Sequence, residues 1–212
     1  MDPLEIVGFV TGAVCVWLAA RENIWTFPVG VANNVVFAWL FVGSGLYAGA
    51  ALQVVYLVLG VLGWWWWARG GRDHGRLEVH RAPRWAWPAA VVGAVASTAV
   101  LAVVLGTWTD SQVPVWDGLT TGLSLVAQLM LNRKWLESWY VWILTDVLLV
   151  GLYVALGLYV TAALYVLFVG LCVQGLRRWR RAQREASAPT LPSDVPPAAG
   201  PGAAAVDGVR AR

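Results

Sequence analysis

One aspartate lies near the middle of a long apolar stretch, and two tryptophans precede it at helical spacing. Residues 136–159 read LESWYVWILTDVLLVGLYVALGLY, with Asp146 as the central acid. Trp139, Trp142 and Asp146 stand at positions i, i+3 and i+7, which share one face of an α-helix. This face suits a ligand with a flat ring, above all a cationic one, and with hydroxyl groups that donate to the carboxylate.

Amide side chains accompany this aspartate in other apolar stretches. Asn33 and Asn34 are adjacent in one stretch, Gln53 lies one turn before Tyr56 in the next, and a later stretch holds Gln128. Further aromatic residues surround them, including Phe27 and Tyr153. The candidate substrate-binding residues are Trp25, Asn33, Asn34, Gln53, Tyr56, Gln128, Trp139, Trp142, Asp146 and Tyr165. An alternative interpretation places Trp139 in an interfacial aromatic belt and lets Asp146 only bind a neighbouring helix.

The composition indicates a membrane protein. Hydrophobic residues make up 59% of the chain and charged residues 13%, the mean hydropathy is +0.63, and there are 15 tryptophans. Residues 23–68, 85–109 and 147–176 contain no Asp, Glu, Lys or Arg. A spanning helix needs about 20 apolar residues, so 23–68 holds two spans joined by a turn at 43–45. An aspartate within a span costs about 2.5–3.5 kcal/mol, so Asp146 should face the protein interior or a watery cavity.

We predict an all-α membrane protein with seven transmembrane helices. The apolar runs are too long for barrel strands, and helices satisfy their own backbone hydrogen bonds in lipid. The predicted helices are residues 4–21, 24–42, 46–68, 86–107, 116–132, 136–155 and 158–177.

The basic residues predict the orientation. Five arginines lie in the loop 69–84, and five more lie between 177 and 184. Arg21, Arg133 and Lys134 fall in connections on the same side. The connections near 43–45, 108–115 and 156–157 have no Lys or Arg. The positive-inside rule then predicts a multi-pass protein of the cell membrane, with its N-terminus outside and its C-terminus in the cytoplasm.

The sequence overlays itself when it is shifted by 112 residues. GLYAGAALQV at 45–54 aligns with GLYVTAALYV at 157–166, and Asn34 aligns with Asp146. Each copy holds three spans, and the fourth span lets both copies point the same way, in a parallel 3+1+3 repeat. The predicted organisation is a first bundle (4–68), a basic cytoplasmic loop (69–84), a linking helix (86–107), a second bundle (116–180) and a disordered tail (185–212).

Several other classes of protein fit poorly. A retinal protein needs a lysine within a span, and the only lysine, Lys134, stands at a helix end. An integral-membrane enzyme needs a catalytic cluster, but His74 and His80 lie in one basic loop. Cys15 and Cys172 both lie in apolar runs, which favours buried, inert thiols. We therefore expect no enzymatic activity, no cofactor, no metal and no nucleic-acid partner.

Three longer segments carry a family resemblance: ENIWTFPVGVANN (22–34), GLYAGAALQVVYLVLGVLGWWWW (45–67) and LESWYVWILTDVLLVGLYVALGLYVTAALY (136–165). Together they resemble the PnuC family of nicotinamide riboside transporters. The resemblance covers about residues 4–180. It implies a fold related to the SWEET sugar transporters, a homotrimer, and uptake of nicotinamide riboside, an NAD precursor, without ATP, with trapping by a cytoplasmic kinase. The positions that match family motifs are Trp25, Asn33, Gln53, Tyr56, Trp142 and Asp146, whereas Gly60 and Leu176 depart from the family pattern.

The expected mechanism is facilitated diffusion by alternating access, in which two three-helix bundles rock about a central site. Pro28 and Gly30 are candidates for loosening the second span during that motion. Three alternatives remain open: coupling to protons through Asp146, transport of another vitamin-like nucleoside, and transport of a sugar.

Overall fold

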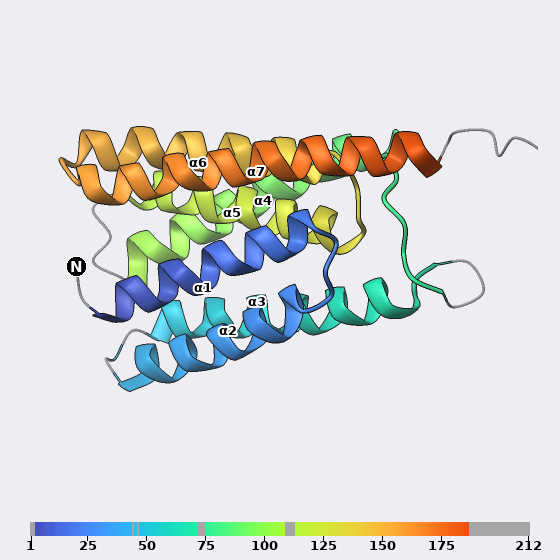
Figure 1. Cartoon of the computed structure of the whole chain (residues 1–212). Coiled ribbons are helices and arrows are strands. Elements are labelled where there is room, and N and C mark those ends of the chain that lie inside the picture. The colour runs from blue at the N-terminus through green and yellow to red at the C-terminus, as the bar shows by residue number, and fades with distance from the viewer. Residues whose placement is uncertain (1–2, 44, 46, 72–74, 109–112, 187–212) are drawn as a thin grey trace, which may run out of the picture.

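The computed structural model describes residues 3–43, 45, 47–71, 75–108 and 113–186, and these residues form seven α-helices (Figure 1). The predicted bounds agree within two residues except at the end of the last helix. The helices are α1 (Pro3–Ala20), α2 (Thr26–Gly43), α3 (Tyr47–Arg69), α4 (Ala86–Trp108), α5 (Pro114–Asn132), α6 (Ser138–Ala155) and α7 (Tyr159–Ala186).

The last helix is longer than predicted. We expected α7 to end at residue 177, but it continues through the arginine-rich segment to Ala186. Arginine favours helices, and in this segment the arginine side chains are exposed to solvent, so nothing ends the helix there. The predicted disordered tail therefore begins too early, since its residues 185 and 186 are helical. Residues 187–212 lie outside the described part of the chain.

Five helices are long and apolar enough to cross a membrane, namely α2, α3, α4, α6 and α7. The apolar part of α1, Ile6–Ala20, is shorter, and α5 is more polar. Helix α5 packs against α3, α4 and α6, and much of it between Gly118 and Asn132 is buried. A helix surrounded by protein does not need an apolar surface on every side. That α1 and α5 also cross the membrane stays a prediction.

Six of the helices form a ring. Within each half of the chain consecutive helices pack together, α1 on α2, α2 on α3, α5 on α6 and α6 on α7. Two contacts between the halves close the ring, α1 against α7 and α3 against α5. Figure 1 shows α2 with α3 along one side of the bundle, α6 with α7 along the other, and α1 between them. Helix α4 lies against α5, outside the ring.

The 112-residue offset reappears in the backbone geometry. Helices α1 and α5 end in residues with left-handed backbone conformation, Glu22 with φ of 54° and Lys134 with φ of 52°. The next N–H group bonds back five residues in both cases, from Asn23 to Leu18 at 2.9 Å and from Trp135 to Met130 at 3.0 Å. These bonds form the Schellman motif that ends many helices. Gly45 and Gly157 are also 112 residues apart, and both have a left-handed backbone conformation, with φ of 75° and 72°. The matched positions support the predicted repeat.

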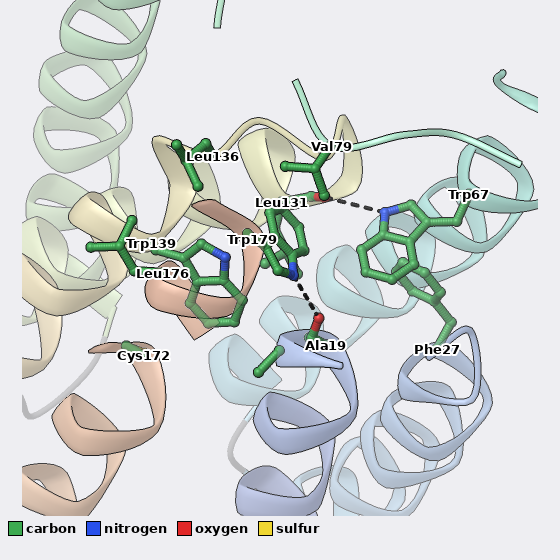
Figure 2. Close-up of a cluster of buried hydrophobic side chains, with 11 residues drawn as sticks. Ala19, Phe27, Trp67, Val79, Leu131, Leu136, Trp139, Cys172, Leu176 and Trp179 are labelled. Carbon is green, nitrogen blue, oxygen red and sulfur yellow. Dashed lines mark hydrogen bonds between the residues drawn. The ribbon is translucent and has the colours of Figure 1, made fainter. Parts of the chain in front are cut away.

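Four aromatic residues join the two halves near the basic connections, and we call Phe27, Trp67, Trp139 and Trp179 the tryptophan cluster. The indole Nε1 of Trp67 donates to the carbonyl of Leu131 on α5 at 3.2 Å, and that of Trp179 donates to the carbonyl of Ala19 on α1 at 3.1 Å (Figure 2). Both the donors and the acceptors are 112 residues apart. Each half is therefore hydrogen-bonded to the other in the same way.

The rings of this cluster repeat the same symmetry. Phe27 meets Trp67 edge-to-face with centroids 5.0 Å apart, and Trp139 meets Trp179 edge-to-face at 5.3 Å. Trp67 and Trp179 contact each other with centroids 5.9 Å apart. Trp67, Trp139 and Trp179 are almost fully buried, and such aromatic pairs add about 0.5–1.5 kcal/mol beyond their burial.

An ion pair lies beside the tryptophan cluster. The Nζ atom of Lys134 is 2.8 Å from Oε2 of Glu22 and 4.5 Å from the centre of the Trp67 ring. The lysine side chain is 7% exposed and that of the glutamate 31%. These two residues are also repeat counterparts, so one position carries an acid in the first half and a base in the second.

Candidate functional site

A cavity of about 390 Å³ lies inside the ring of helices. Its walls come from α1, α2, α3, α5, α6 and α7. Most of the predicted site residues line it together, namely Asn33, Asn34, Gln53, Tyr56, Gln128, Trp139, Trp142, Asp146 and Tyr165. The volume is in the range of small-molecule sites.

Trp25 is the exception among the predicted site residues. It does not line the cavity, and its side chain is 63% exposed. The residue belongs to the turn before α2, where the Asn23 side chain accepts a hydrogen bond from its backbone N–H at 3.0 Å. The next two residues, Thr26 and Phe27, are buried and reach the cavity instead. The exposed indole of Trp25 fits an interfacial position.

Asp146 faces the cavity and is 5% exposed. Trp139, Trp142 and Asp146 all line the cavity, as their shared helical face predicted. The Sγ of Cys172 on α7 donates a weak hydrogen bond to Oδ2 of the carboxylate at 3.4 Å. A thiol is a poor partner for a buried carboxylate, so a donor on a bound ligand would find an available acceptor here.

Two of the amide side chains in the wall, Asn33 and Gln128, are held in place by neighbouring side chains. Oδ1 of Asn33 accepts a hydrogen bond from the Thr11 hydroxyl at 2.9 Å. Gln128 donates through Nε2 to Oδ1 of Asn132 at 2.9 Å, and Asn132 in turn donates to the carbonyl of Leu59 at 2.7 Å. These bonds connect α1 with α2, and α5 with α3. Asn33 and Gln128 are thus positioned before any ligand binds, which reduces the entropy lost on binding.

The repeat brings many of the lining residues to the cavity in pairs. Phe27 pairs with Trp139, Gln53 with Tyr165, Asn34 with Asp146, Tyr56 with Phe168, Gly30 with Trp142, and Gly60 with Cys172. The members of a pair differ in type: the indoles of Trp139 and Trp142 and the acid Asp146 are in the second half, opposite Phe27, Gly30 and Asn34. The wall from α2 and α3 is therefore richer in amides and glycines, whereas the wall from α6 and α7 carries the tryptophans and the carboxylate.

An aromatic row supports the second wall. Tyr153 stacks on Tyr165 with centroids 5.3 Å apart and an angle of 19° between the planes. Tyr165 then contacts Phe168 at 5.8 Å, and Phe168 contacts Phe9 of α1 at 5.2 Å. Tyr153, which we expected near the site, lies behind the wall as a support and does not line it.

Sequence reasoning missed several lining residues. Phe168 is the counterpart of the predicted site residue Tyr56, so the repeat offered a signal for it, whereas Cys172 aligns with Gly60, which was not predicted to line the site. Cys15 and Cys172, which were predicted to be buried and inert, both contribute to the wall; Cys172 is buried and Cys15 half-buried, and their inertness stays a prediction. Gly12, Gly30 and Gly60 also reach the cavity. Gly30 is the counterpart of the predicted residue Trp142, whereas no sequence signal separates Gly12 and Gly60 from glycines that only allow helices to pack.

A ring of apolar helices around a central cavity with amides, indoles and one carboxylate defines a multi-pass membrane transporter. The chain belongs to the nicotinamide mononucleotide transporter family, whose model matches residues 2–181. This membership confirms the prediction of a transporter rather than an enzyme.

Individual relatives agree with this assignment. The nicotinamide riboside transporter PnuC of Escherichia coli K12 is 26% identical over 207 residues, covering 86% of this chain and 87% of the relative. The riboflavin/roseoflavin transporter RibM of Streptomyces davaonensis is 29% identical over 191 residues, covering 88% and 89%. The crystal structure of the vitamin B3 transporter PnuC superimposes with a TM-score of 0.66 at 24% identity, covering 87% of this chain and 83% of that one. The last comparison shows that the fold is shared.

Water access to the cavity can be tested with cysteines on α3. In a background with Cys15 and Cys172 changed to Ala, we expect Gln53→Cys to react with a charged, water-soluble methanethiosulfonate at least about tenfold faster than Val54→Cys. Gln53 lines the cavity, whereas Val54 is 52% exposed on the outer surface of an apolar helix and faces lipid, where a thiol does not ionise. The measurement is the labelling rate in membranes, and equal rates at both positions would contradict a watery cavity.

Proposed function

We propose that this protein carries nicotinamide riboside into the cell by facilitated diffusion. The carboxylate of Asp146 in an aromatic-walled cavity is the observation that supports this substrate most strongly. Nicotinamide riboside has a flat ring with a permanent positive charge and a ribose with several hydroxyl groups. The ring would lie against the tryptophans near the carboxylate, and the ribose would bind the amides.

Charge complementarity explains why an acid is tolerated at this depth. Two opposite unit charges 4 Å apart attract by about 4 kcal/mol at an effective dielectric constant of about 20. This attraction is of the same size as the cost of placing an aspartate within a span. Indole faces add cation–π attraction for the same ring. A cationic ligand in the cavity would therefore offset the free-energy cost of placing the Asp146 carboxylate within the span.

Riboflavin is the second candidate, and the Streptomyces relative named for that vitamin supports it. A cavity of about 390 Å³ does not separate the two ligands by size. Their charge does separate them, because the flavin ring is neutral and gains nothing from a carboxylate counter-charge. A simple sugar would leave the aromatic wall without a partner. Asp146 therefore favours the cationic nucleoside.

The tryptophan cluster supports an alternating-access mechanism. Phe27 and Trp139 belong both to this cluster and to the cavity wall, so the cluster lies directly beside the cavity. We propose that it forms the cytoplasmic seal together with the Glu22–Lys134 ion pair, since the basic connections lie at this end. Release into the cytoplasm then requires that the two halves part here. The N-terminus would lie outside, and the native assembly would be a homotrimer.

Uptake into proteoliposomes tests the substrate and the driving force. With the membrane potential clamped at zero, we expect labelled nicotinamide riboside to enter until the inside and outside concentrations are equal. Unlabelled nicotinamide riboside should compete, whereas ribose should not. If an imposed pH gradient drives accumulation, transport is coupled to protons and is not uncoupled diffusion. If riboflavin competes and unlabelled nicotinamide riboside does not, the substrate is a flavin.

The role of Asp146 can be tested with one pair of ligands. We expect Asp146→Asn to weaken the binding of nicotinamide riboside by about tenfold or more, because it removes the counter-charge but keeps the shape. Reduced nicotinamide riboside, whose ring is uncharged, should lose much less affinity. Isothermal titration of the purified protein measures both affinities.

A matched control accompanies this substitution. Trp25→Ala should keep wild-type affinity, because its side chain lies outside the cavity. If Asp146→Asn affects the charged and the uncharged ligand equally, the carboxylate has a structural role and the charge argument fails.

The ion pair can be tested by exchanging its charges. Glu22→Lys or Lys134→Glu alone places like charges together, and we expect a loss of about 1–3 kcal/mol of stability and slower uptake. This range lies below that of a fully buried pair because the Glu22 side chain is 31% exposed. The double exchange should recover most of both losses, because the ammonium at position 22 would face Trp179, the counterpart of Trp67. Thermal unfolding and vesicle uptake provide the measurements, and a double variant as defective as the single ones would exclude a role for the pair.

A further inference from the structure

A second hollow lies at the basic end of the protein, away from the central cavity. It has a volume of about 360 Å³ and is formed by the start of α6, the end of α7 and the loop before α4. We call it the arginine groove, and its lining residues are Arg81, Leu136, Glu137, Tyr140, Arg180, Gln183 and Arg184. It shares no lining residue with the central cavity, and the proposed transport function does not use it.

The loop that supplies Arg81 is fixed on the body of the protein. The backbone N–H of Ala82 donates to Oε2 of Glu137 at 2.7 Å. His80 bonds to the turn between α5 and α6 through its backbone, donating to Lys134 at 3.2 Å and accepting from Leu136 at 3.0 Å. Its ring Nε2 also accepts from the indole of Trp135 at 3.1 Å. Arg81 lies between two anchored residues, so its place beside the groove is part of the fold.

The groove has an excess of positive charge. Three guanidinium groups line it, and Glu137 is the only acid among the lining residues. One oxygen of that acid is already bound to the Ala82 backbone. Arg180 donates through Nη2 to the hydroxyl of Tyr140 and lies 5.5 Å from the centre of that ring. Guanidinium groups bind phosphate oxygens well because their donors are fixed in a plane.

The groove continues into a surface that faces lipid. Tyr140, Leu144 and Val147 stand at i, i+4 and i+7 on α6 and are 41%, 50% and 51% exposed. These residues form a stripe along one face of α6 that begins at the groove and runs toward the middle of the apolar helix. An acyl chain can lie along such a stripe while its headgroup stays among the arginines. A soluble phosphate would use the arginines but not the stripe.

We propose that the arginine groove binds the phosphate headgroup of an anionic phospholipid of the leaflet at the basic end. The arginines from two helices and one loop surround the phosphodiester, and the α6 stripe receives an acyl chain. Basic pockets between transmembrane helices on the cytoplasmic side are suited to such headgroups. The bound lipid would tie α6, α7 and the loop together.

Thermal unfolding of the full-length protein in detergent tests this site. We expect phosphatidylglycerol to raise the unfolding temperature of the wild type more than phosphatidylcholine with the same chains. The double substitution Arg81→Gln and Arg184→Gln should weaken the apparent affinity for phosphatidylglycerol by about tenfold or more. Arg181→Gln is the matched control, because this arginine is exposed on the same helix but does not line the groove, and it should keep the wild-type response.

Two further measurements identify the ligand and show whether the Gln variants lose the response only because they misfold. Arg81→Lys and Arg184→Lys together should restore part of the response, since a positive charge returns. Inorganic phosphate should not reproduce the effect of the lipid, and if it does so at equal concentration, the site takes a soluble phosphate and the lipid assignment is wrong. An equal loss in Arg181→Gln, or an equal response to both lipids, would also overturn the proposal.

Discussion

A carboxylate in the middle of a membrane span must be kept away from hydrocarbon, and this constraint organises the protein. Asp146 meets it by facing a cavity that six helices enclose. The contacts of α1 with α7 and of α3 with α5 close the ring, and both of them lie between the two halves. Both three-helix halves contribute to the wall of the cavity that the acid faces. Shielding the carboxylate and joining the two halves therefore depend on the same helix contacts.

The joint between the halves is concentrated at one end. Two indole N–H groups donate across it to the backbone carbonyls of Leu131 and Ala19 in the last turns of α5 and α1. Each carbonyl also accepts a backbone N–H from the residue that ends the helix, Lys134 or Glu22. Toward the other end, Phe168 contacts Phe9 edge-to-face across the same interface. Directional bonds at one end and ring contacts at the other give the joint two unequal parts. The rocking motion that we propose between the halves would use this difference.

Much of this arrangement could be predicted from the sequence. Charge-free runs located the helices, and helical spacing placed Trp139, Trp142 and Asp146 on one face. Trp25 shows the limit, because an interfacial tryptophan and a site tryptophan look the same in one dimension. The repeat contained the better signal: Trp25 aligns with Glu137, whereas Phe27 aligns with the cavity residue Trp139. The partners of Glu22 and Cys172 could not be predicted, since both depend on how the halves meet.

The pairing of Glu22 with Lys134 has a consequence for how such a molecule can be built. Two identical three-helix units, meeting about the same axis, would place the same side chain opposite itself at this point. Two acids or two bases would then repel each other beside the buried tryptophans. Two copies within one chain can differ in sequence, so one copy can carry the acid and the other the base. With both copies in one chain, Glu22 and Lys134 attract each other at a position where two identical units could have only like charges or neutral side chains.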